Sequence, residues 1–264
     1  MVITILGSGS EGNSIVLQSG NDSIMIDAGF IKDELLRRLT EAEVHLDSIR
    51  AIFLTHGHSD HVCGVADFAR HIGVPVHMTE NLFVAGTQGA ARQKPWLNLS
   101  INEVSIFSAW DRIPVGAFQI VPVPVSHDST STVGLVLSSG DLKLSIATDL
   151  GGMSIGAMGA MQGADIIMLE SNHDNDMLWN SQRHFLLKKR ISGPTGHLSN
   201  EKCAEMLYEL MTEKTSDVVL LHLSRECNTP ELAAEAVRSK NPRLGVGRCR
   251  LHIASQNEDL SLNI

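Results

Sequence analysis

Residues 55–61 have the sequence Thr-His-Gly-His-Ser-Asp-His, and this segment carries the clearest signal in the chain. It directly follows the short apolar run Ala51–Leu54, which we expect to form a strand. Imidazole nitrogen and carboxylate oxygen are the ligands that Zn²⁺ and similar divalent ions accept when no thiolate is used. We therefore interpret the four polar side chains of this segment as metal ligands: His56, His58, Asp60 and His61.

The spacing within the segment indicates two ions rather than one. His56 and His58 are two residues apart, so both side chains can point the same way from an extended backbone. Asp60 and His61 follow a bend and can face a neighbouring point. Four such donors in a tight turn would crowd one tetrahedral ion, whereas two ions a few ångströms apart accommodate them.

Two ions need further ligands, and the chain offers ligand-capable residues after three other apolar runs. His127 follows Ile120–Val125, Asp149 follows Leu144–Thr148 and His222 follows Val218–Leu221. A single histidine at a strand end is usually structural. The assignment of these three residues therefore depends mainly on the resemblance described below.

Composition favours a globular protein. The chain has 264 residues, of which 43% are apolar, 19% charged and only 4% aromatic, so a sizeable aliphatic core can be buried. The formal net charge of −9 does not suggest a nucleic-acid binder, although local charge at a site can oppose the global charge.

Targeting signals and thiols point to the cytoplasm. The four cysteines (Cys63, Cys203, Cys227 and Cys249) are scattered and form no CxxC pair. The N-terminal residues lack the basic and apolar regions of a signal peptide, and no run of 18 apolar residues predicts a membrane span. We expect a cytoplasmic protein with reduced thiols.

The order of expected elements predicts an α/β protein with two sheets and helices outside. The first half favours strands, including a hairpin around Ser19–Asp22, with helices at Asp33–Leu39 and Val65–Arg70. In the second half strands alternate with the helices Asn200–Met211 and Pro230–Ser239. The other expected strands are Val2–Leu6, Ser14–Gln18, Ser23–Asp27, Val74–Met78, Phe118–Pro122, Thr132–Leu137, Lys143–Ala147, Asp165–Leu169 and Arg248–Ile253.

The order of the ligand candidates resembles the metallo-β-lactamase superfamily, over nearly the whole chain. The resemblance implies the four-layer αβ/βα sandwich, as a single domain over residues 1–264. One metal would take His56, His58 and His127. The other would take Asp60, His61 and His222, with Asp149 bridging. Asp27 would orient a ligand histidine without binding the metal itself.

Finer motifs are similar to the YycJ (WalJ) group of that superfamily. These motifs are Gly7–Ser14, Ser126–Asp128, Glu170–Asp174, Gly196–Asn200 and His222–Ser224. The resemblance implies a 5′-to-3′ exonuclease acting on DNA, with two divalent ions (Zn, Mn or Fe). Relatives with a β-CASP insertion need a large extra domain, but only 72 residues separate Asp149 from His222. Flavodiiron relatives carry a glutamate at the position of His58, so the histidine here favours hydrolysis over oxygen chemistry.

An acidic chain can still attract DNA at such a site. Two ions bring +4, while Asp60, Asp149 and a bridging hydroxide leave a local charge near +1. We expect this metal-bridging hydroxide to attack phosphorus. Asp60 then acts in catalysis as a ligand. His173 or His197 would assist as proton donor or phosphate contact, unless each is merely structural.

Further residues have both a functional and a structural interpretation. Arg225 would clamp a phosphate or lie on an ordinary surface. Ser10 and Asn13 would line the floor of the active site or simply form a tight turn. Lys188–Arg190 with Arg183 would be a solvated face or a nucleic-acid track. We expect Gly151–Ala164 to be a flexible or closely packed loop.

Three other activities remain open at this point. The same metals would serve an RNA-processing nuclease similar to tRNase Z, or a hydrolase of thioesters or lactones. A metal-binding protein without turnover is the third alternative. The sequence fixes neither the metal nor an oligomeric state.

Overall fold

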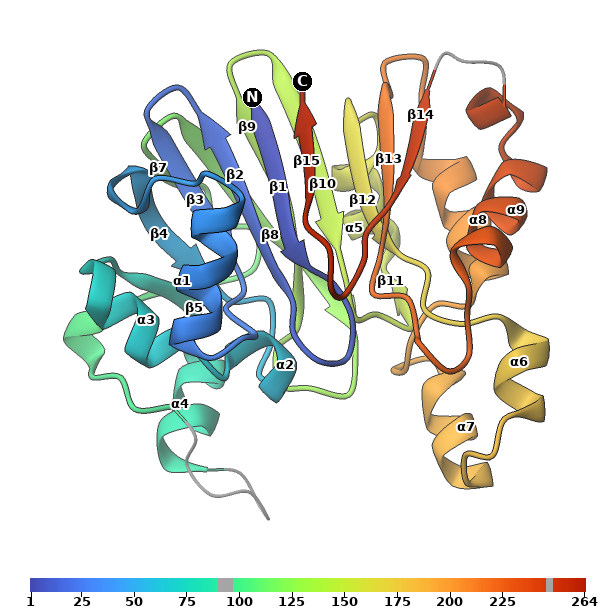
Figure 1. The fold of residues 1–264 in the computed structure, drawn as a ribbon, viewed down its shortest axis with the longest axis horizontal. Helices are drawn as coiled ribbons and strands as arrows, with labels where there is room; N and C mark the ends of the chain where they lie inside the picture. The colour runs from blue at the N-terminus through green and yellow to red at the C-terminus, as the bar shows by residue number, and fades with distance from the viewer. Residues whose placement is uncertain (90–96, 246–248) are drawn as a thin grey trace. The chain divides into compact units, whose positions relative to one another are not determined.

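The computed structural model describes residues 1–89, 97–245 and 249–264. The chain divides into two compact units (Figure 1). Unit 1 comprises Met1–Pro122, Ser129–Val133 and Gln256–Ile264, and unit 2 comprises Val123–Asp128 and Gly134–Ser255. The expectation of a single domain over the whole chain stays a prediction.

Unit 1 contains one mixed sheet with the strand order β15-β1-β2-β3-β4-β5-β6. Strands β15, β1, β2 and β3 pair antiparallel, whereas β3 to β6 pair parallel. The expected hairpin joins β2 to β3, where Gly20 adopts a positive φ of 59° that glycine tolerates well. The bounds are β1 Val2–Gly7, β2 Ser14–Ser19, β3 Asp22–Ile26, β4 Ile49–Phe53, β5 Val76–Thr79, β6 Val104–Phe107 and β15 Leu260–Asn263.

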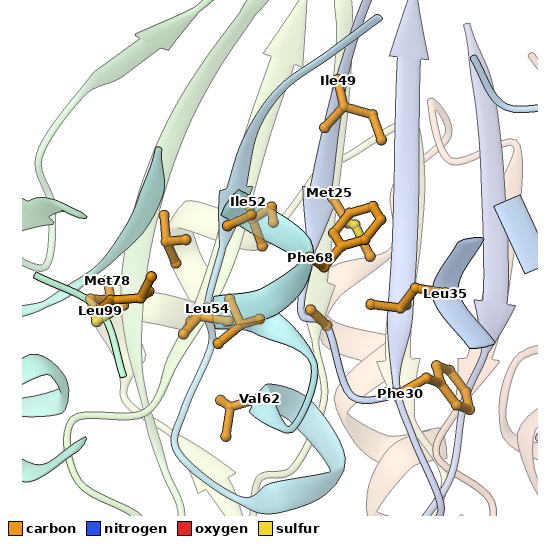
Figure 2. Close-up of a cluster of buried hydrophobic side chains, with 14 of the residues drawn as sticks. Met25, Phe30, Leu35, Ile49, Ile52, Leu54, Val62, Phe68, Met78 and Leu99 are labelled. Atoms are coloured by element: carbon orange, nitrogen blue, oxygen red, sulfur yellow. The ribbon is translucent and has the colours of Figure 1, made fainter. Parts of the chain in front are cut away.

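Helices of unit 1 bury their apolar sides against this sheet. Leu35 of α1 and Phe68 of α3 join the core formed by alternate strand residues such as Met25, Ile52 and Met78 (Figure 2). Burying a large aliphatic or aromatic side chain contributes about 1.5–3 kcal/mol. The helices are α1 Lys32–Glu41, α2 Ser59–Val62, α3 Val65–Ile72 and α4 Glu80–Gln88, with 3-10 turns at Leu46–Ser48 and Ile101–Glu103.

The second sheet has the strand order β11-β8-β9-β10-β12-β13-β14, with β7 paired to β8. Strand β8 begins in unit 1 and continues into unit 2. From β10 to β14 the strands pair parallel, so the carboxyl ends of β10, β12 and β13 lie at one edge. The bounds are β7 Ile113–Val115, β8 Phe118–Ser126, β9 Val133–Ser139, β10 Leu142–Ala147, β11 Gly152–Met153, β12 Ile166–Glu170, β13 Asp217–Leu221 and β14 Arg250–Ile253.

The helices of unit 2 follow its parallel strands in the chain. Figure 1 shows α8 and α9 together beside β13 and β14. Helix α9 begins at Pro230 as expected, and Thr229 caps it by accepting from the Leu232 backbone N–H. The helices are α5 Ile155–Met161, α6 Asn175–Asn180, α7 Phe185–Ile191, α8 Asn200–Leu210 and α9 Pro230–Lys240, with a 3-10 turn at Pro242–Gly245.

The expectation of a loop over Gly151–Ala164 is wrong. This segment contains the short strand β11 and the helix α5. Ser154 caps the helix by accepting from the Ala157 backbone N–H, and Ala157 and Met161 are buried. Glycine and alanine give little apolar periodicity, so packing rather than pattern determines this helix.

The two sheets and the alternation of strands and helices in the second half are confirmed. The sequence did not predict the helices α2, α4, α6 and α7 or the strands β6, β7 and β15. The start of the expected strand Arg248–Ile253 lies partly outside the described residues. Among the described helices, none is both long and apolar enough to cross a membrane.

Candidate functional site

The histidine-rich segment of unit 1 forms a compact cluster at the end of β4. His56 and His58 lie in the loop after the strand, and α2 carries Asp60 and His61. The His56 Nε2 and His58 Nδ1 atoms are 3.1 Å apart, and the His56 and His61 ring centroids are 4.1 Å apart. The expected bend is present, and the short helix brings His61 back to His56.

Asp27 fixes the protonation of two of these histidines. Its Oδ2 accepts from His61 Nδ1 at 2.7 Å and from the Thr55 hydroxyl at 2.8 Å. A carboxylate only accepts, so His61 carries a proton on Nδ1. The Thr55 hydroxyl donates its hydrogen to Asp27 and must accept from His56 Nδ1, 3.1 Å away. His56 therefore also carries a proton on Nδ1, and its Nε2 lies 3.1 Å from His58 Nδ1.

The Gly7–Ser14 loop reaches this cluster through Asn13. The Asn13 amide nitrogen is 2.9 Å from His61 Nε2 and 2.9 Å from the Gly9 carbonyl oxygen. Gln256 holds the same loop by donating to the Gly12 carbonyl oxygen, a contact that nothing in the sequence suggested. Ser10 is exposed. The substrate roles of Ser10 and Asn13 stay predictions.

Unit 2 brings its three predicted ligands together at the ends of β8, β10 and β13. Asp149 Oδ1 is 3.3 Å from His222 Nδ1 and 3.9 Å from His127 Nε2. The Gly196 carbonyl oxygen accepts from His127 Nδ1 at 3.0 Å, which places a ring proton on Nδ1. All three side chains are buried.

Glu170, at the end of β12, was not among the predicted site residues. Its Oε1 accepts from His197 Nδ1 at 2.7 Å and from His222 Nδ1 at 2.9 Å. Its Oε2 accepts the backbone N–H groups of Leu150 and Leu198. Burial raises the pKa of Glu170, but the two histidines outweigh it and lower the pKa to about 2. The residue could have been found, since it too is polar and follows an apolar strand.

The two proposed proton donors differ in environment. His197 is partly exposed; burial lowers its pKa, but the Glu170 carboxylate outweighs burial and the net shift is upward. His173 is buried, and neither ring nitrogen has a hydrogen-bond partner among the described residues. Burial lowers the pKa of His173 to about 4. These environments favour His197 as a proton donor and a structural role for His173.

Arg225 lies in the turn after His222 and is exposed. Its predicted contact with phosphate stays a prediction. By contrast, Asn172 lies against His222 and donates from its side-chain amide to the His222 carbonyl oxygen at 3.0 Å.

The donor chemistry of both units fits divalent cations. Asp149, Glu170, His197 and His222 each offer one ligand atom, and these four atoms lie within 4.8 Å of one another. In each unit a buried carboxylate, Asp27 or Glu170, binds the Nδ1 side of a histidine. This carboxylate–histidine arrangement is the usual support of a metal-binding imidazole.

Comparison with known proteins places these observations in context. The model of the beta-lactamase superfamily domain matches residues 22–223. The chain is 30% identical over 244 residues to "Exodeoxyribonuclease YycJ" of Bacillus anthracis, covering 92% of this chain and 90% of that protein. It is 32% identical over 230 residues to "Exodeoxyribonuclease WalJ" of Streptococcus pneumoniae serotype 2, covering 87% and 84%.

Solved structures agree at the level of the fold. The metallo-beta-lactamase fold protein YhfI from Bacillus subtilis has a TM-score of 0.71 at 15% identity, covering 99% of both chains. Zn(2+)-bound PqqB from Methylobacterium extorquens gives 0.68 at 15% identity, and the short form of human tRNase Z gives 0.65 at 16%; both cover 100% of both chains. The fold class predicted from the sequence is confirmed.

Proposed function

The chain belongs to the metallo-β-lactamase superfamily, in its YycJ (WalJ) branch, and from this membership we propose that it is a 5′-to-3′ exodeoxyribonuclease dependent on two divalent metal ions. The observation that carries the hydrolase assignment is the pair of buried carboxylates, Asp27 and Glu170, each bound to Nδ1 of a candidate ligand histidine. The choice of DNA rests on the names of the two relatives.

The residues that would hold the metals follow from the family membership. His56, His58 and His127 would bind one ion, Asp60, His61 and His222 the other, and Asp149 both. Such ions supply Lewis-acid chemistry, which activates water near neutral pH and offsets charge on the phosphate. Zn, Mn and Fe all accept this set of imidazoles and carboxylates.

The chain's own residues prepare this chemistry before substrate arrives. Asp27 keeps a proton on His61 Nδ1, and Glu170 does the same for His222, so each imidazole would bind a metal through Nε2. Fixed tautomers and ring orientations remove reorganisation that would otherwise oppose metal binding.

His197 is the residue we assign to the leaving group. Hydrolysis of a phosphodiester expels an alkoxide oxygen, which needs a proton. Glu170 holds His197 through Nδ1 at 2.7 Å, so the opposite nitrogen, Nε2, is the one that can pass a proton to that oxygen. Glu170 then stabilises the ring in either protonation state and keeps it oriented.

Digestion of end-labelled DNA tests the proposal. The metal-loaded protein is incubated with 5′-phosphorylated DNA labelled at either end. A 5′-to-3′ exonuclease releases the 5′ label at once as a mononucleotide and shortens the 3′-labelled strand progressively. Asp60→Ala should abolish both, whereas Asp67→Ala, which removes an exposed carboxylate on α3, should not.

Other outcomes contradict the proposal in distinct ways. Cleavage of RNA but not DNA would make the chain an RNA-processing nuclease. Hydrolysis of thioesters or lactones alone would make it a small-molecule hydrolase. A full complement of metal without hydrolysis of any ester would make it a metal-binding protein without turnover.

A further inference from the structure

The helices α6 and α7 form a hairpin in the segment between Glu170 and His197, the proposed proton donor. The chain leaves the sheet at Glu170, passes through α6 and α7, and returns at His197, which is bound to Glu170. Figure 1 shows α6 and α7 away from the strands of unit 2, at the lower right. A ligand bound on this hairpin would therefore lie on the segment of chain that connects Glu170 to His197.

Two aromatic rings and two leucines of this hairpin are exposed. The exposed fractions are 43% for Trp179, 55% for Phe185, 67% for Leu186 and 38% for Leu187. The Trp179 and Phe185 ring centroids are 6.1 Å apart. The hairpin's own small core uses other residues, Leu178 and Ile191, so the two rings are not needed to hold it together. Exposed aromatic residues grouped in this way mark binding surfaces.

The same segment reverses the charge of the chain. Between Asp176 and Glu201 there are no carboxylates, while four cationic residues occur in a protein of net charge −9: Arg183, Lys188, Lys189 and Arg190. A cationic segment in an acidic chain is complementary to a polyanion.

The four cations do not play the same part. Lys188 is structural, because its buried ammonium donates to the carbonyl oxygens of Trp179 and Ser181 and closes the turn between the helices. Arg183 pairs with Glu226. Arg190 binds Asp128 through Nε but leaves 60% of its side chain exposed. Lys189 is exposed, with its ammonium 5.0 Å from the centre of the Phe185 ring.

We propose that Trp179, Phe185 and Lys189 form a binding surface for single-stranded DNA. The two rings would stack on unpaired bases, and Lys189 would contact the phosphate beside them. Stacking accepts any base, which suits an enzyme that must advance along every sequence. Duplex DNA hides its base faces, so the surface selects an unpaired strand. This inference rests on the proposed function and adds to it a substrate contact outside the metal centre.

Variants that remove a ring without removing apolar bulk test the inference. Trp179→Leu and Phe185→Leu abolish stacking, whereas Trp179→Phe and Phe185→Tyr retain it. Leu186→Ser is the control for apolar surface on the same hairpin, and Tyr208→Leu is the control for an exposed ring on α8. The lysine is tested separately with Lys189→Gln.

Binding is measured with metal-loaded protein and a fluorescent oligothymidylate of about 16 nucleotides, made resistant to cleavage by phosphorothioate linkages. Each ring-to-leucine variant should weaken binding about 5-fold or more, which corresponds to the lower range measured for one stacked base. The ring-retaining variants and both controls should bind like the wild type. Lys189→Gln should reduce the slope of log affinity against log salt by about 0.7.

Hydrolysis of bis(p-nitrophenyl) phosphate separates this surface from the metal centre, and it should be unchanged in every variant. If Leu186→Ser weakens binding as much as Phe185→Leu, binding depends on apolar surface in general rather than on stacking, and the inference is overturned. It is also overturned if the wild type degrades DNA and the ring-to-leucine variants bind normally. If the wild type degrades no DNA, the proposed function itself fails.

Discussion

Asp27, Asp149 and His222 share a backbone conformation that residues with a side chain rarely adopt. Their φ angles are 59°, 53° and 54°, in the left-handed region, and each residue follows a strand of its unit. Asp27 follows β3, Asp149 comes shortly after β10, and His222 follows β13. Such strain costs about 1–3 kcal/mol and persists where surrounding contacts impose it, which is typical of functional sites.

The first prediction concerns the carboxylate of Asp27. Asp27→Asn keeps the size of the side chain but replaces one acceptor oxygen with a donor, facing the Thr55 and His61 donors that now bind it. Metal affinity should fall about 10–100-fold, as for other supports of ligand histidines. Competition with a chromophoric chelator measures this loss.

The matched control is Asp22→Asn, which alters a carboxylate paired with Arg50 at the surface of the same strand. Its metal affinity should equal that of the wild type. Equal affinity in Asp27→Asn as well would contradict the role of Asp27 in fixing the ring of His61.

Glu170 shows where sequence reasoning at single residues succeeded and where it stopped. The segment around His56 was identified because several donors are adjacent in sequence. Glu170 satisfies the same criterion as Asp149, a polar residue after an apolar strand, but a lone glutamate is common at that position. Only its contacts with His197 and His222 distinguish it.

At the scale of elements, the edge between β13 and β14 gives a pH-dependent prediction. Asp217, buried at the start of β13, accepts from Arg250 and His252 of β14 at 2.8 Å each. Burial raises its pKa, but these donors and Ser216 outweigh burial and lower the pKa below its ordinary value. A carboxyl group with a lowered folded pKa stabilises the fold above about pH 4 and loses that contribution as the pH falls through the folded pKa.

Asp217→Asn should therefore lower the free energy of unfolding by about 1–3 kcal/mol at neutral pH. The difference from the wild type should narrow below about pH 4, where the carboxyl group of the unfolded wild-type chain begins to bind a proton and the folded one does not yet. Urea denaturation at neutral pH and below about pH 4 measures the free energy of unfolding of each variant. Asp141→Asn, which alters an exposed carboxylate, is the control. An equal difference at both pH values would exclude the charge of Asp217 as the cause.

A second prediction at this scale concerns how closely the loop after β3 approaches α2. A Cβ atom on Gly29 would lie 1.7 Å from the Asp60 carbonyl oxygen and 2.6 Å from the Asn13 backbone nitrogen. Gly29→Ala must push α2 away, at a cost of about 3 kcal/mol. Because α2 carries Asp60 and His61, the metal content of the purified variant should also fall; wild-type metal content would refute this coupling.

Helix α5, by contrast, contains a glycine with space for a larger side chain. A Cβ atom on Gly159 would meet no atom within 4 Å, and the residue lies in a helix. Gly159→Ala should raise the free energy of unfolding by about 0.5–1 kcal/mol, because alanine loses less backbone entropy. Thermal unfolding measures the gain. A loss of stability would argue against a helix over residues 155–161 and in favour of the loop that the sequence analysis expected there.

Sequence periodicity explains which elements were predictable. Continuous apolar runs predicted the strands of the parallel region, and α8 and α9 were expected over Asn200–Met211 and Pro230–Ser239. Helices α5, α6 and α7 have no more than seven residues each, too few to establish a helical period. Strand β15 depends on pairing with β1, which lies at the opposite end of the chain, so no local pattern predicts it.

At the scale of the whole molecule, the number of residues between two distant positions in the chain does not tell how far apart they lie in space. His127, Asp149 and His222 were linked to one another by their order in a family pattern. The structure brings these three together within unit 2, and places His56, His58, Asp60 and His61 together within unit 1. That both donor sets serve one hydrolysis stays part of the proposal.

A double-mutant cycle decides this last point. His61→Ala removes a proposed ligand from unit 1, and His222→Ala removes one from unit 2. Residues that act as one catalytic unit show strongly non-additive effects, because the first substitution already removes what the second would. The double variant should therefore hydrolyse DNA no more slowly than the slower single variant. If instead the two losses multiply, each donor set contributes independently, and the proposal of a shared two-metal hydrolysis is wrong.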